Sequence, residues 1–325
     1  MKIALIGPGI MPIPPQGWGA VEIIVWHVYQ QMTKFGHEVV IFNDKNLKTV
    51  CDSINSGGFD FVHSHYDEHV PFLNSHLKMP FVCTSHYGWL LKFNRWDHNY
   101  YDRLFSSALE APGIFALSSN IAEMFKKAGA KGFVTFLRNG TYVDDMKFKK
   151  DGQNNRALYL GQVSHRKQQG LISRFCGHRC AIDFVGPKAD NSLKDNGKCQ
   201  YTGAWTKECV NNYMTNYNCL VLISDGEAAP LVVIEALAAG LSVVVSRAAS
   251  ENLEPKPFIS IVEDSQVKIN AELVSDEINK QIENNKIHRE EIREYAKQRF
   301  DWSVICREYE KKIGDFNDSL RNSGR

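Results

Sequence analysis

Two glutamates, Glu227 and Glu235, stand in the segment 224–240, which reads SDGEAAPLVVIEALAAG. The segment follows an apolar run, CLVLIS, that is typical of a buried strand. Pro230 suits the first turn of a helix and Gly240 its end. Glu227 is therefore expected on the loop at the carboxyl end of a strand, and Glu235 inside the helix. Ligands of open α/β sheets bind at that edge, where a helix amino end also favours phosphate. The spacing alone fits two solvated surface acids equally well.

The composition describes a folded protein large enough for two domains. The chain has 325 residues, of which 43% are hydrophobic and 23% charged, as in average globular proteins. A net charge of +1 excludes a strong field that would attract nucleic acid or an anionic membrane. The longest apolar stretch, 231–245, is too short to span a bilayer, and eight cysteines in largely apolar runs suit a reducing compartment. We expect a cytoplasmic protein.

Strand-like and helical patterns alternate along the whole chain, which predicts parallel sheets covered by helices on both faces. The expected strands are KIALIG, HEVVIF, FDFVHSH, PFVCTSH, GIFALS, GFVTFL, ALYLG, AIDFVG, CQYTG, CLVLIS, LSVVVS and FISIVE. A polar stretch without apolar periodicity, 144–156, is interpreted as an interdomain linker. We therefore expect domains at 1–145 and 146–300. A final helix, 301–325, either crosses back to the first domain or stays with the second.

The segment with the two glutamates resembles the Glu-x7-Glu signature of glycosyltransferase family 4, whose usual form is E-G-F-G-L-x-x-x-E-A-x-A-x-G. Glu227, Glu235 and Leu231 match, whereas Ala228-Ala229-Pro230 replaces the Gly-aromatic-Gly stretch. This resemblance implies the α/β GT-B fold, with two Rossmann-like, doubly wound parallel-sheet domains facing a central cleft. It places the acceptor on the first domain and the nucleotide-sugar donor on the second.

Further family landmarks occur in the expected order. PPQGWGAVE at 14–22 resembles the glycine-rich loop P-x-x-G-x-G-G-x-E and contains Gly17 and Gly19. CTSHYGW at 83–89 resembles a strand ending in T-x-H-G, which places His86 at the transferred sugar. YLGQVSHRKQQG at 159–170 resembles G-R-x-x-x-x-K-G, whose basic residues bind the donor pyrophosphate.

The last of these motifs departs from the family pattern. Lys167 is retained, but Gln162 replaces the expected arginine and Gln168 the expected glycine. Arg166 is the neighbouring cation that could supply the missing charge, although adjacent residues of a helix point in different directions. Arg166 and Lys167 also fit a solvated basic pair.

Three histidines, at 63, 65 and 69, suggest a metal site, but FDFVHSH matches the family's strand end D-x-V-H-x-H better. No metal site is expected. Shorter matches are RNGTYVDD at 138–145, FVGP at 184–187, YTGAW at 201–205 and the carboxyl-terminal QRFDWSVICREYE. The aromatic residues after His86 are either core residues or platforms for an acceptor sugar.

The resemblance implies a retaining glycosyltransferase that moves a hexose-type sugar to a hydroxyl group of a glycan, a lipid-linked glycan or a small molecule. UDP is the first expectation for the nucleotide and GDP the second, with no cofactor and no metal ion. Lys167, the helix that begins near Pro230 and the loop from Gly17 to Gly19 would hold the diphosphate. Glu235 would bind the ribose, and Glu227 and His86 the sugar.

Two alternatives remain open. One is a sugar-nucleotide epimerase of the GT-B architecture, against which the Glu-x7-Glu motif argues. The other is a catalytically eroded module that binds a sugar nucleotide or a glycan, suggested by the substitutions Ala20, Gln162 and Gln168. Nucleic acid is not an expected partner, peripheral contact with a membrane is an alternative, and the sequence does not indicate the oligomeric state.

Overall fold

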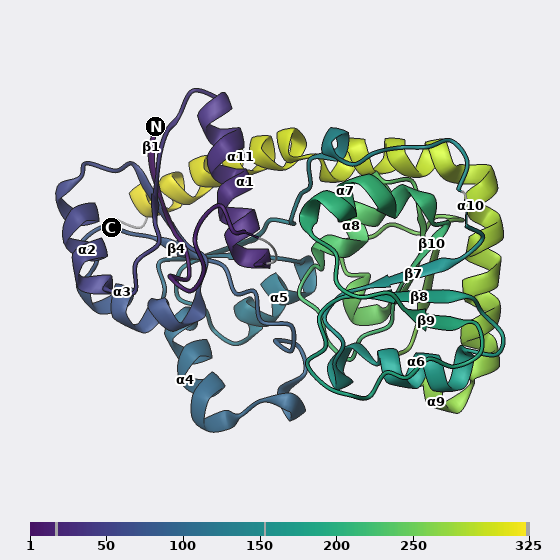
Figure 1. The fold of residues 1–325 in the computed structure, drawn as a ribbon. Coiled ribbons are helices and arrows are strands. Elements are labelled where there is room, and N and C mark those ends of the chain that lie inside the picture. Colours follow the sequence, from purple (N-terminus) through teal and green to yellow (C-terminus); the bar gives the residue numbers. More distant parts are fainter. Residues whose placement is uncertain (17–18, 153, 323–325) are drawn as a thin grey trace. The chain divides into compact units, whose positions relative to one another are not determined.

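The computed structural model describes residues 1–16, 19–152 and 154–322. The chain forms two compact units, unit 1 comprising Met1–Asn139 with Trp302–Arg325, and unit 2 comprising Gly140–Asp301 (Figure 1). The first boundary falls at 139/140, where the sequence analysis placed it at 145/146. The reason is that Val143 is fully buried in the hydrophobic core of unit 2.

Unit 1 contains a six-stranded sheet in the order β2-β1-β3-β4-β5-β6, with all neighbouring strands parallel. Its strands are β1 (Lys2–Ile6), β2 (Glu38–Phe42), β3 (Phe61–Ser64), β4 (Val82–Cys83), β5 (Gly113–Ala116) and β6 (Phe133–Phe136). Its α-helices are α1 (Ala20–Lys34), α2 (Leu47–Ser56), α3 (Val70–His76), α4 (His98–Leu109), α5 (Ser119–Lys127) and α11 (Trp302–Asn322), and its 3-10 helices are η1 (Asp67–His69) and η2 (Phe93–Arg95).

Unit 2 contains a second six-stranded parallel sheet, in the order β12-β11-β10-β7-β8-β9. Its strands are β7 (Ala157–Leu160), β8 (Ile182–Val185), β9 (Cys199–Tyr201), β10 (Cys219–Leu222), β11 (Ser242–Ser246) and β12 (Ile259–Val262). Its α-helices are α6 (Gln169–Cys176), α7 (Lys207–Tyr213), α8 (Leu231–Ala238), α9 (Gln266–Ile269) and α10 (Ala271–Phe300), and its 3-10 helices are η3 (Val143–Asp145), η4 (His165–Lys167), η5 (Met214–Asn216) and η6 (Arg247–Ala249).

Each predicted strand run contains one strand, so the predicted pair of doubly wound parallel sheets is confirmed. The central strands are continuous apolar runs because helices cover both faces of each sheet. Residues 3–6 of β1 and 219–222 of β10, for example, are completely buried. Among the described residues, every helix is too short or too polar to cross a membrane.

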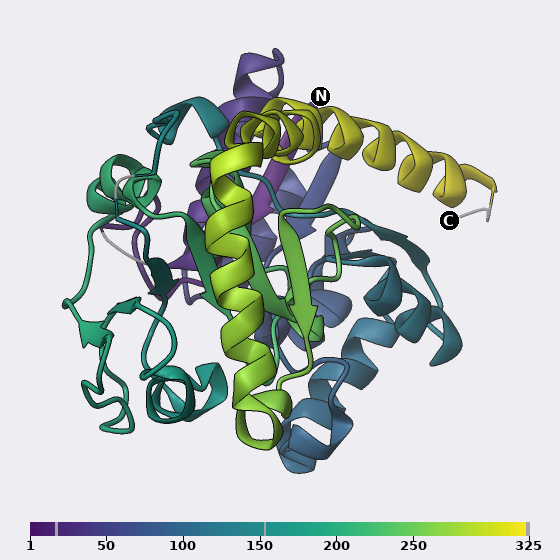
Figure 2. The same cartoon turned by 90° about the vertical axis from the view of Figure 1, so that its right-hand side faces the viewer.

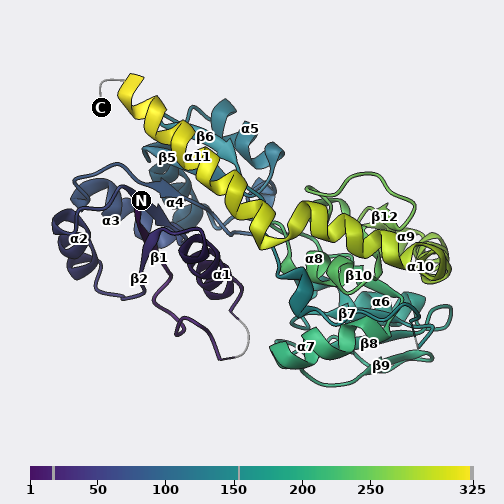
Figure 3. The same ribbon diagram turned by 90° about the horizontal axis from the view of Figure 1, so that it is seen from above.

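Helix α11 belongs to unit 1, a placement that the sequence pattern had left open. It runs beside α1 (Figure 3). Its face with Trp302, Tyr309 and Phe316 is buried. The Trp302 indole Nε1 donates a hydrogen bond to His27 Nδ1 at 2.9 Å. This anchoring of a terminal helix by large aromatic side chains explains why its apolar positions recur at helical spacing.

In each sheet, the order in which strands are added changes side at the first strand of the unit. In unit 1 the chain adds β2 on one side of β1 and β3 on the other, and in unit 2 it adds β8 on one side of β7 and β10 on the other. The loops after the two central strands diverge at such a switch point and leave room for a ligand. The loops after β7 and β10 are those that carry Lys167 and Glu227.

The polar stretch 144–156, interpreted as a linker, is part of unit 2. Helix α10 lies across the sheet of this unit (Figure 2), and its buried Arg289 ties the stretch down. The guanidinium donates to the carbonyls of Lys149 at 2.6 Å and Tyr217 at 3.0 Å, and also to that of Thr215. Burial lowers the pKa of Arg289 to about 10. Hydrogen bonds from a buried guanidinium to backbone carbonyls, rather than regularly spaced apolar side chains, thus attach the stretch 144–156 to unit 2.

Replacing Arg289 should destabilise unit 2. Arg289→Met leaves several buried carbonyls without a donor, and we expect a loss of about 3 kcal/mol in the free energy of unfolding, measured by urea denaturation. Lys286→Met, on an exposed part of the same helix, should leave the free energy almost unchanged. Equal losses in the two variants would contradict this account.

Candidate active site

A buried ion-pair cluster occupies the carboxyl edge of the sheet in unit 2. Lys167 Nζ lies 2.8 Å and Arg166 Nη1 3.2 Å from the same oxygen, Glu227 Oε1. The hydroxyl of Ser224 donates a further hydrogen bond to that oxygen at 2.8 Å. Only 9% of the Glu227 side chain and 13% of the Lys167 side chain are exposed. The structure therefore brings together three residues that the sequence analysis proposed for the donor site.

Arg166 and Lys167 converge although they are adjacent in sequence. They lie in the short 3-10 helix η4, which Ser164 caps by accepting from Lys167 N. The loop after β10 docks onto η4, because Asp225 N donates to the Arg166 carbonyl at 2.8 Å and the Arg166 guanidinium donates to the Gly226 carbonyl. The expected divergence of neighbouring helical residues is therefore wrong here: the docked loop brings Glu227 to both cations.

The electrostatics of the cluster favour an ionised Glu227. Burial alone would raise the pKa of the carboxyl, but Lys167 and Arg166 outweigh it and lower the pKa below its ordinary value. Next to the cluster, burial and the charge of Glu227 raise the pKa of Tyr159 well above its ordinary value. The site thus holds two cations and one anion at neutral pH, a net positive charge suited to a diphosphate.

Glycines allow the strands to end close together at this edge. A Cβ at Gly186, after β8, would lie 2.1 Å from the Gly161 carbonyl oxygen after β7, and Gly186 has φ +143°. A Cβ at Gly161 would lie 3.2 Å from Lys167 Cδ, so the lysine stem runs directly over that glycine. Bulkier residues at either position would displace the lysine or the strand ends.

The loop into α8 adopts a conformation unusual for its residues. Ala229 has φ +59°, and Pro230 is the N-cap of α8 with Leu231 as its first residue. Gly240 follows the helix with φ +85°, as expected from its predicted role at the helix end. Ala228 and Leu231 are half-buried. The segment 228–230, which replaces the Gly-aromatic-Gly stretch of the motif, thus connects Glu227 to the amino end of α8.

Glu235 lies inside α8, as predicted, but it has a cationic partner that the sequence analysis missed. Lys207 Nζ lies 2.5 Å from Glu235 Oε1. Lys207 is the first residue of α7, which follows β9, so it too comes from the carboxyl edge of the sheet. The position of Lys207, shortly after the predicted strand CQYTG, was the sequence feature that could have indicated this partner.

The two glutamines have different surroundings. The Gln162 carbonyl accepts a hydrogen bond from Gln169 Nε2 at 3.0 Å, in the loop after β7. Gln168 has φ +59°, a left-handed conformation that a glycine would adopt without strain. This conformation gives a physical reason for the glycine in the motif that the segment resembles.

His86 lies after β4 in unit 1, beside two buried histidines, His63 in β3 and His65 directly after it. Its Nε2 is 3.4 Å from Nδ1 of His65, whose ring contacts that of His63 at a centroid distance of 3.9 Å, with 37° between the two planes. Burial lowers the pKa of His86 to about 4 and that of His63 to about 3, so both rings are neutral at pH 7. Asp67, which accepts from Ser85 and the His86 backbone, has its pKa raised by burial to about 6.

The glycine-rich loop is described in part. Gly19 is the N-cap of α1, and a Cβ there would lie 2.9 Å from the buried Glu22 Oε2. Gly17 lies outside the described residues. Among the residues that are described, no group of three or more His, Cys, Asp and Glu side chains is arranged to hold a metal ion.

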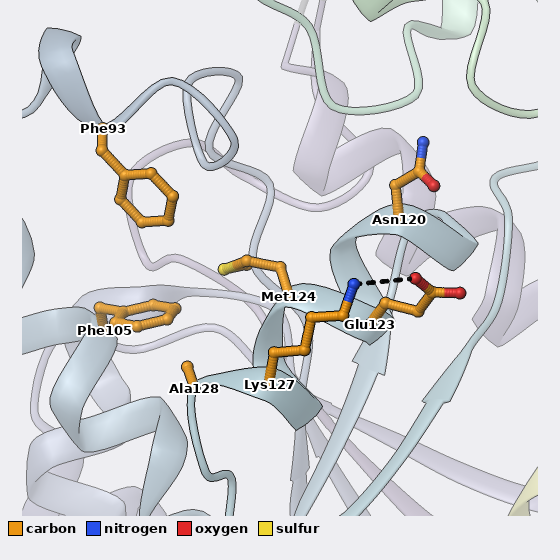
Figure 4. Close-up of a pocket in the computed structure, with 7 residues that line it drawn as sticks. All are labelled: Phe93, Phe105, Asn120, Glu123, Met124, Lys127 and Ala128. Atoms are coloured by element: carbon orange, nitrogen blue, oxygen red, sulfur yellow. Dashed lines mark ion pairs between the residues drawn. The ribbon is translucent and has the colours of Figure 1, made fainter.

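An open pocket of about 580 Å³ lies elsewhere in unit 1 and contains none of the predicted site residues (Figure 4). Its wall includes Phe93, Phe105 and Met124, and a Glu123–Lys127 ion pair of 3.6 Å lies at its side. Of the aromatic residues after His86, Trp96 belongs to the hydrophobic core, with Tyr87 and Tyr101 packed against it, whereas Phe93 is exposed.

A comparison with known protein families finds a match within unit 2. Residues 155–278 match the family model described as "Glycosyl transferases group 1". No curated protein sequence matches the chain.

Solved structures share the fold of the whole chain. Sucrose-phosphate synthase from Thermosynechococcus elongatus has a TM-score of 0.70 at 15% identity, with 99% of each chain covered. The Anabaena protein HepE in complex with UDP-glucose has a TM-score of 0.70 at 15% identity, with 97% of this chain and 100% of that chain covered. The lipopolysaccharide outer core galactosyltransferase WaaB has 0.69 at 15%, covering 97% and 99%. These are GT-B structures, so the predicted GT-B fold is confirmed.

The lowered pKa of Glu227 predicts a pH-dependent stability. An acid whose pKa is lower in the folded than in the unfolded protein stabilises the fold above its unfolded pKa, and this stabilisation is lost as the pH falls through the folded pKa. The difference in unfolding free energy between the wild type and Glu227→Gln should therefore be largest near pH 7 and shrink below about pH 4.5. Urea denaturation at several pH values measures it, and a difference that grows on acidification would refute the assignment.

Proposed function

We infer that this glycosyltransferase, which has the GT-B fold and carries a glycosyl transferases group 1 segment at 155–278, moves a hexose-type sugar from a UDP-sugar to a hydroxyl acceptor, with retention and without a metal ion. The observation that carries the proposal is the cluster of Lys167, Arg166 and Glu227 at the switch point of unit 2. UDP is preferred over GDP because HepE is a structural neighbour seen with UDP-glucose and with UDP and glucose.

The diphosphate would bind where cations and the amino end of a helix coincide. Sugar transfer breaks the anomeric C–O bond and leaves negative charge on the diphosphate, which must be stabilised as it develops. Lys167 and Arg166 supply two positive charges, and the amino end of α8, which begins at Leu231, adds the positive end of the helix dipole. These groups support our proposal that the side chains and the helix, rather than a metal ion, stabilise the leaving group.

The two glutamates would bind the rest of the donor. Ionised carboxylates accept hydrogen bonds from hydroxyl groups, so Glu227 is proposed for the sugar and Glu235 for the ribose. Lys207, bonded to one oxygen of Glu235, would hold this carboxylate in place and leave the other oxygen for the ribose. His86 is proposed to contact the transferred sugar as a neutral imidazole, because its lowered pKa leaves it uncharged at pH 7.

Retention is proposed to follow from attack on the same face that the diphosphate leaves. The acceptor oxygen forms the new bond to the anomeric carbon, the bond to the diphosphate oxygen breaks, and that oxygen takes the acceptor proton. A double displacement would need a carboxylate nucleophile. Glu227 is poorly suited to this role, because Lys167 and Arg166 bind its carboxylate and lower its pKa, which makes it a weaker nucleophile. We therefore propose that Glu227 positions the sugar and stabilises its transition state.

The proposed acceptor is a hydroxyl group of a glycan, a lipid-linked glycan or a small molecule. Peripheral contact with a membrane also stays a prediction. The exposed side chains of Leu91 and Phe93 in unit 1 are compatible with it.

Nucleotide binding should depend on Lys167. Lys167→Met removes a charge-assisted contact to the diphosphate, and we expect UDP to bind about tenfold more weakly or worse by isothermal titration calorimetry. Lys198→Met is the matched control, because Lys198 is exposed before β9, at the opposite edge of the sheet. Equal UDP affinity in the two variants would argue against the diphosphate site.

Transfer should depend on Glu227 more than binding does. Glu227→Gln removes the negative charge and replaces one of the two acceptor oxygens with an NH₂ donor, and we expect a ~10²–10³-fold lower turnover. UDP affinity should not fall, because both cations are retained. Release of UDP from a UDP-sugar, followed with and without a glycan mixture, measures this. Release that never responds to an acceptor would favour an epimerase or a binding module.

A further inference from the structure

Three histidines form a row in unit 1, two of them buried, His63 and His65, and the third, His86, half-buried. His63 and His65 follow each other on alternate positions of the chain at the end of β3, and His86 follows the neighbouring strand β4. The rings of His65 and His86 are stacked at a centroid distance of 5.7 Å, with 26° between their planes. The proposed function uses only His86, so the row contains two histidines whose purpose is unexplained.

Hydrogen bonds fix the protonation of His63. Thr84 Oγ1 donates its single proton to the Phe115 carbonyl at 2.7 Å, so it must accept from His63 Nε2 at 2.8 Å. His63 Nδ1 then accepts from the Tyr309 hydroxyl at 2.7 Å. Both ring nitrogens of His63 are satisfied in a neutral tautomer, so His63 acts as a structural link between α11 and the sheet.

His65 is different because, among the residues that the structure describes, only one of its ring nitrogens has a partner. Nδ1 faces His86 Nε2 at 3.4 Å, whereas Nε2 is buried and has no hydrogen-bond partner in the described part of the chain. The side chain is 3% exposed, and burial lowers its pKa well below the ordinary value, so the ring is neutral and carries one proton. That proton lies either on Nδ1 or on the unpartnered Nε2.

The unpartnered nitrogen decides between the two arrangements. If His86 Nε2 donated to His65, the proton of His65 would lie on Nε2 as a buried N–H without an acceptor. Buried N–H groups without a partner are rarer in proteins than acceptors that lack a donor. With the proton on Nδ1, His65 donates to His86 Nε2, and the proton of the neutral His86 must lie on its Nδ1.

We propose that His65 is a positioning residue that holds His86 in the Nδ1–H tautomer, so that His86 presents a hydrogen-bond donor to a hydroxyl or ring oxygen of the transferred sugar. The proposal rests on the proposed function for the part that concerns the sugar. The tautomer itself follows from unit 1 alone. A donor at this position selects sugars that offer an acceptor oxygen there.

The tautomer can be observed directly. In protein labelled with ¹⁵N-histidine, long-range ¹H–¹⁵N correlations distinguish protonated from bare ring nitrogens, and His86→Gln identifies the signals of His86. We expect a protonated Nδ1 and a bare Nε2 for His86 in the wild type at pH 7. A protonated Nε2 would overturn the proposal whether or not the protein transfers sugar.

Variants of His65 test its influence. His65→Leu removes the donor and should produce a mixture of His86 tautomers, whereas His65→Asn keeps an N–H near the position of Nδ1 and should retain the wild-type tautomer. His69→Leu replaces another buried histidine, one that packs on Tyr66, and should leave the tautomer unchanged. An unchanged tautomer in His65→Leu would also overturn the proposal.

Kinetics connect the tautomer to the sugar. We expect about a tenfold lower kcat in His65→Leu, partial rescue in His65→Asn and unchanged UDP affinity in both, since UDP lacks the sugar. Normal turnover in a His65→Leu protein whose tautomer has changed would overturn the link to the sugar. Absence of any sugar transfer by the wild type would instead refute the proposed function and leave the tautomer result intact.

Discussion

The burial of one carboxylate governs the geometry of unit 2. A carboxylate removed from water is stable in its ionised form only when cations and hydrogen-bond donors surround it. Glu227 meets this condition through Lys167, Arg166 and Ser224. Because these residues come from the loops after β7 and β10, the same interaction joins two loops that the sheet topology forces apart. The carboxylate thereby holds both cations in place.

The two units differ in the kind of polar groups that they bury. Unit 2 concentrates charges, with a second ion pair between Lys207 and Glu235 beside the first. Unit 1 buries neutral imidazoles, whose pKa values burial lowers, and satisfies His63 through Tyr309 and Thr84. Charges suit an ionic leaving group, and neutral donors and acceptors suit hydroxyl groups. Unit 2 therefore offers charged groups and unit 1 neutral hydrogen-bonding groups.

The sequence predicted the features that depend on local pattern. The twelve strands were predictable because buried parallel strands are continuous apolar runs. Lys167, Glu227 and Glu235 were proposed because their segments resemble family motifs; Lys167 and Glu227 lie in loops after strands, and Glu235 lies in α8. It did not predict features that depend on docking between distant segments. Arg166 reaches Glu227 only because the loop after β10 binds to η4. The stretch 144–156 lacks apolar periodicity, yet Arg289 holds it onto unit 2 from more than a hundred residues away. Lys207 pairs with Glu235, and His65 with His86, because each pair follows strands of the same sheet that are far apart in the sequence.

The central claim is that Lys167 serves a bound diphosphate and is not merely the counter-ion of Glu227. The most direct test measures UDP affinity in a Glu227→Gln background, with and without Lys167→Met, because the carboxylate no longer needs a counter-ion there. If Lys167 binds the diphosphate, the double variant should bind UDP about tenfold more weakly than Glu227→Gln alone. Equal UDP affinity in the single and double variants would contradict the account.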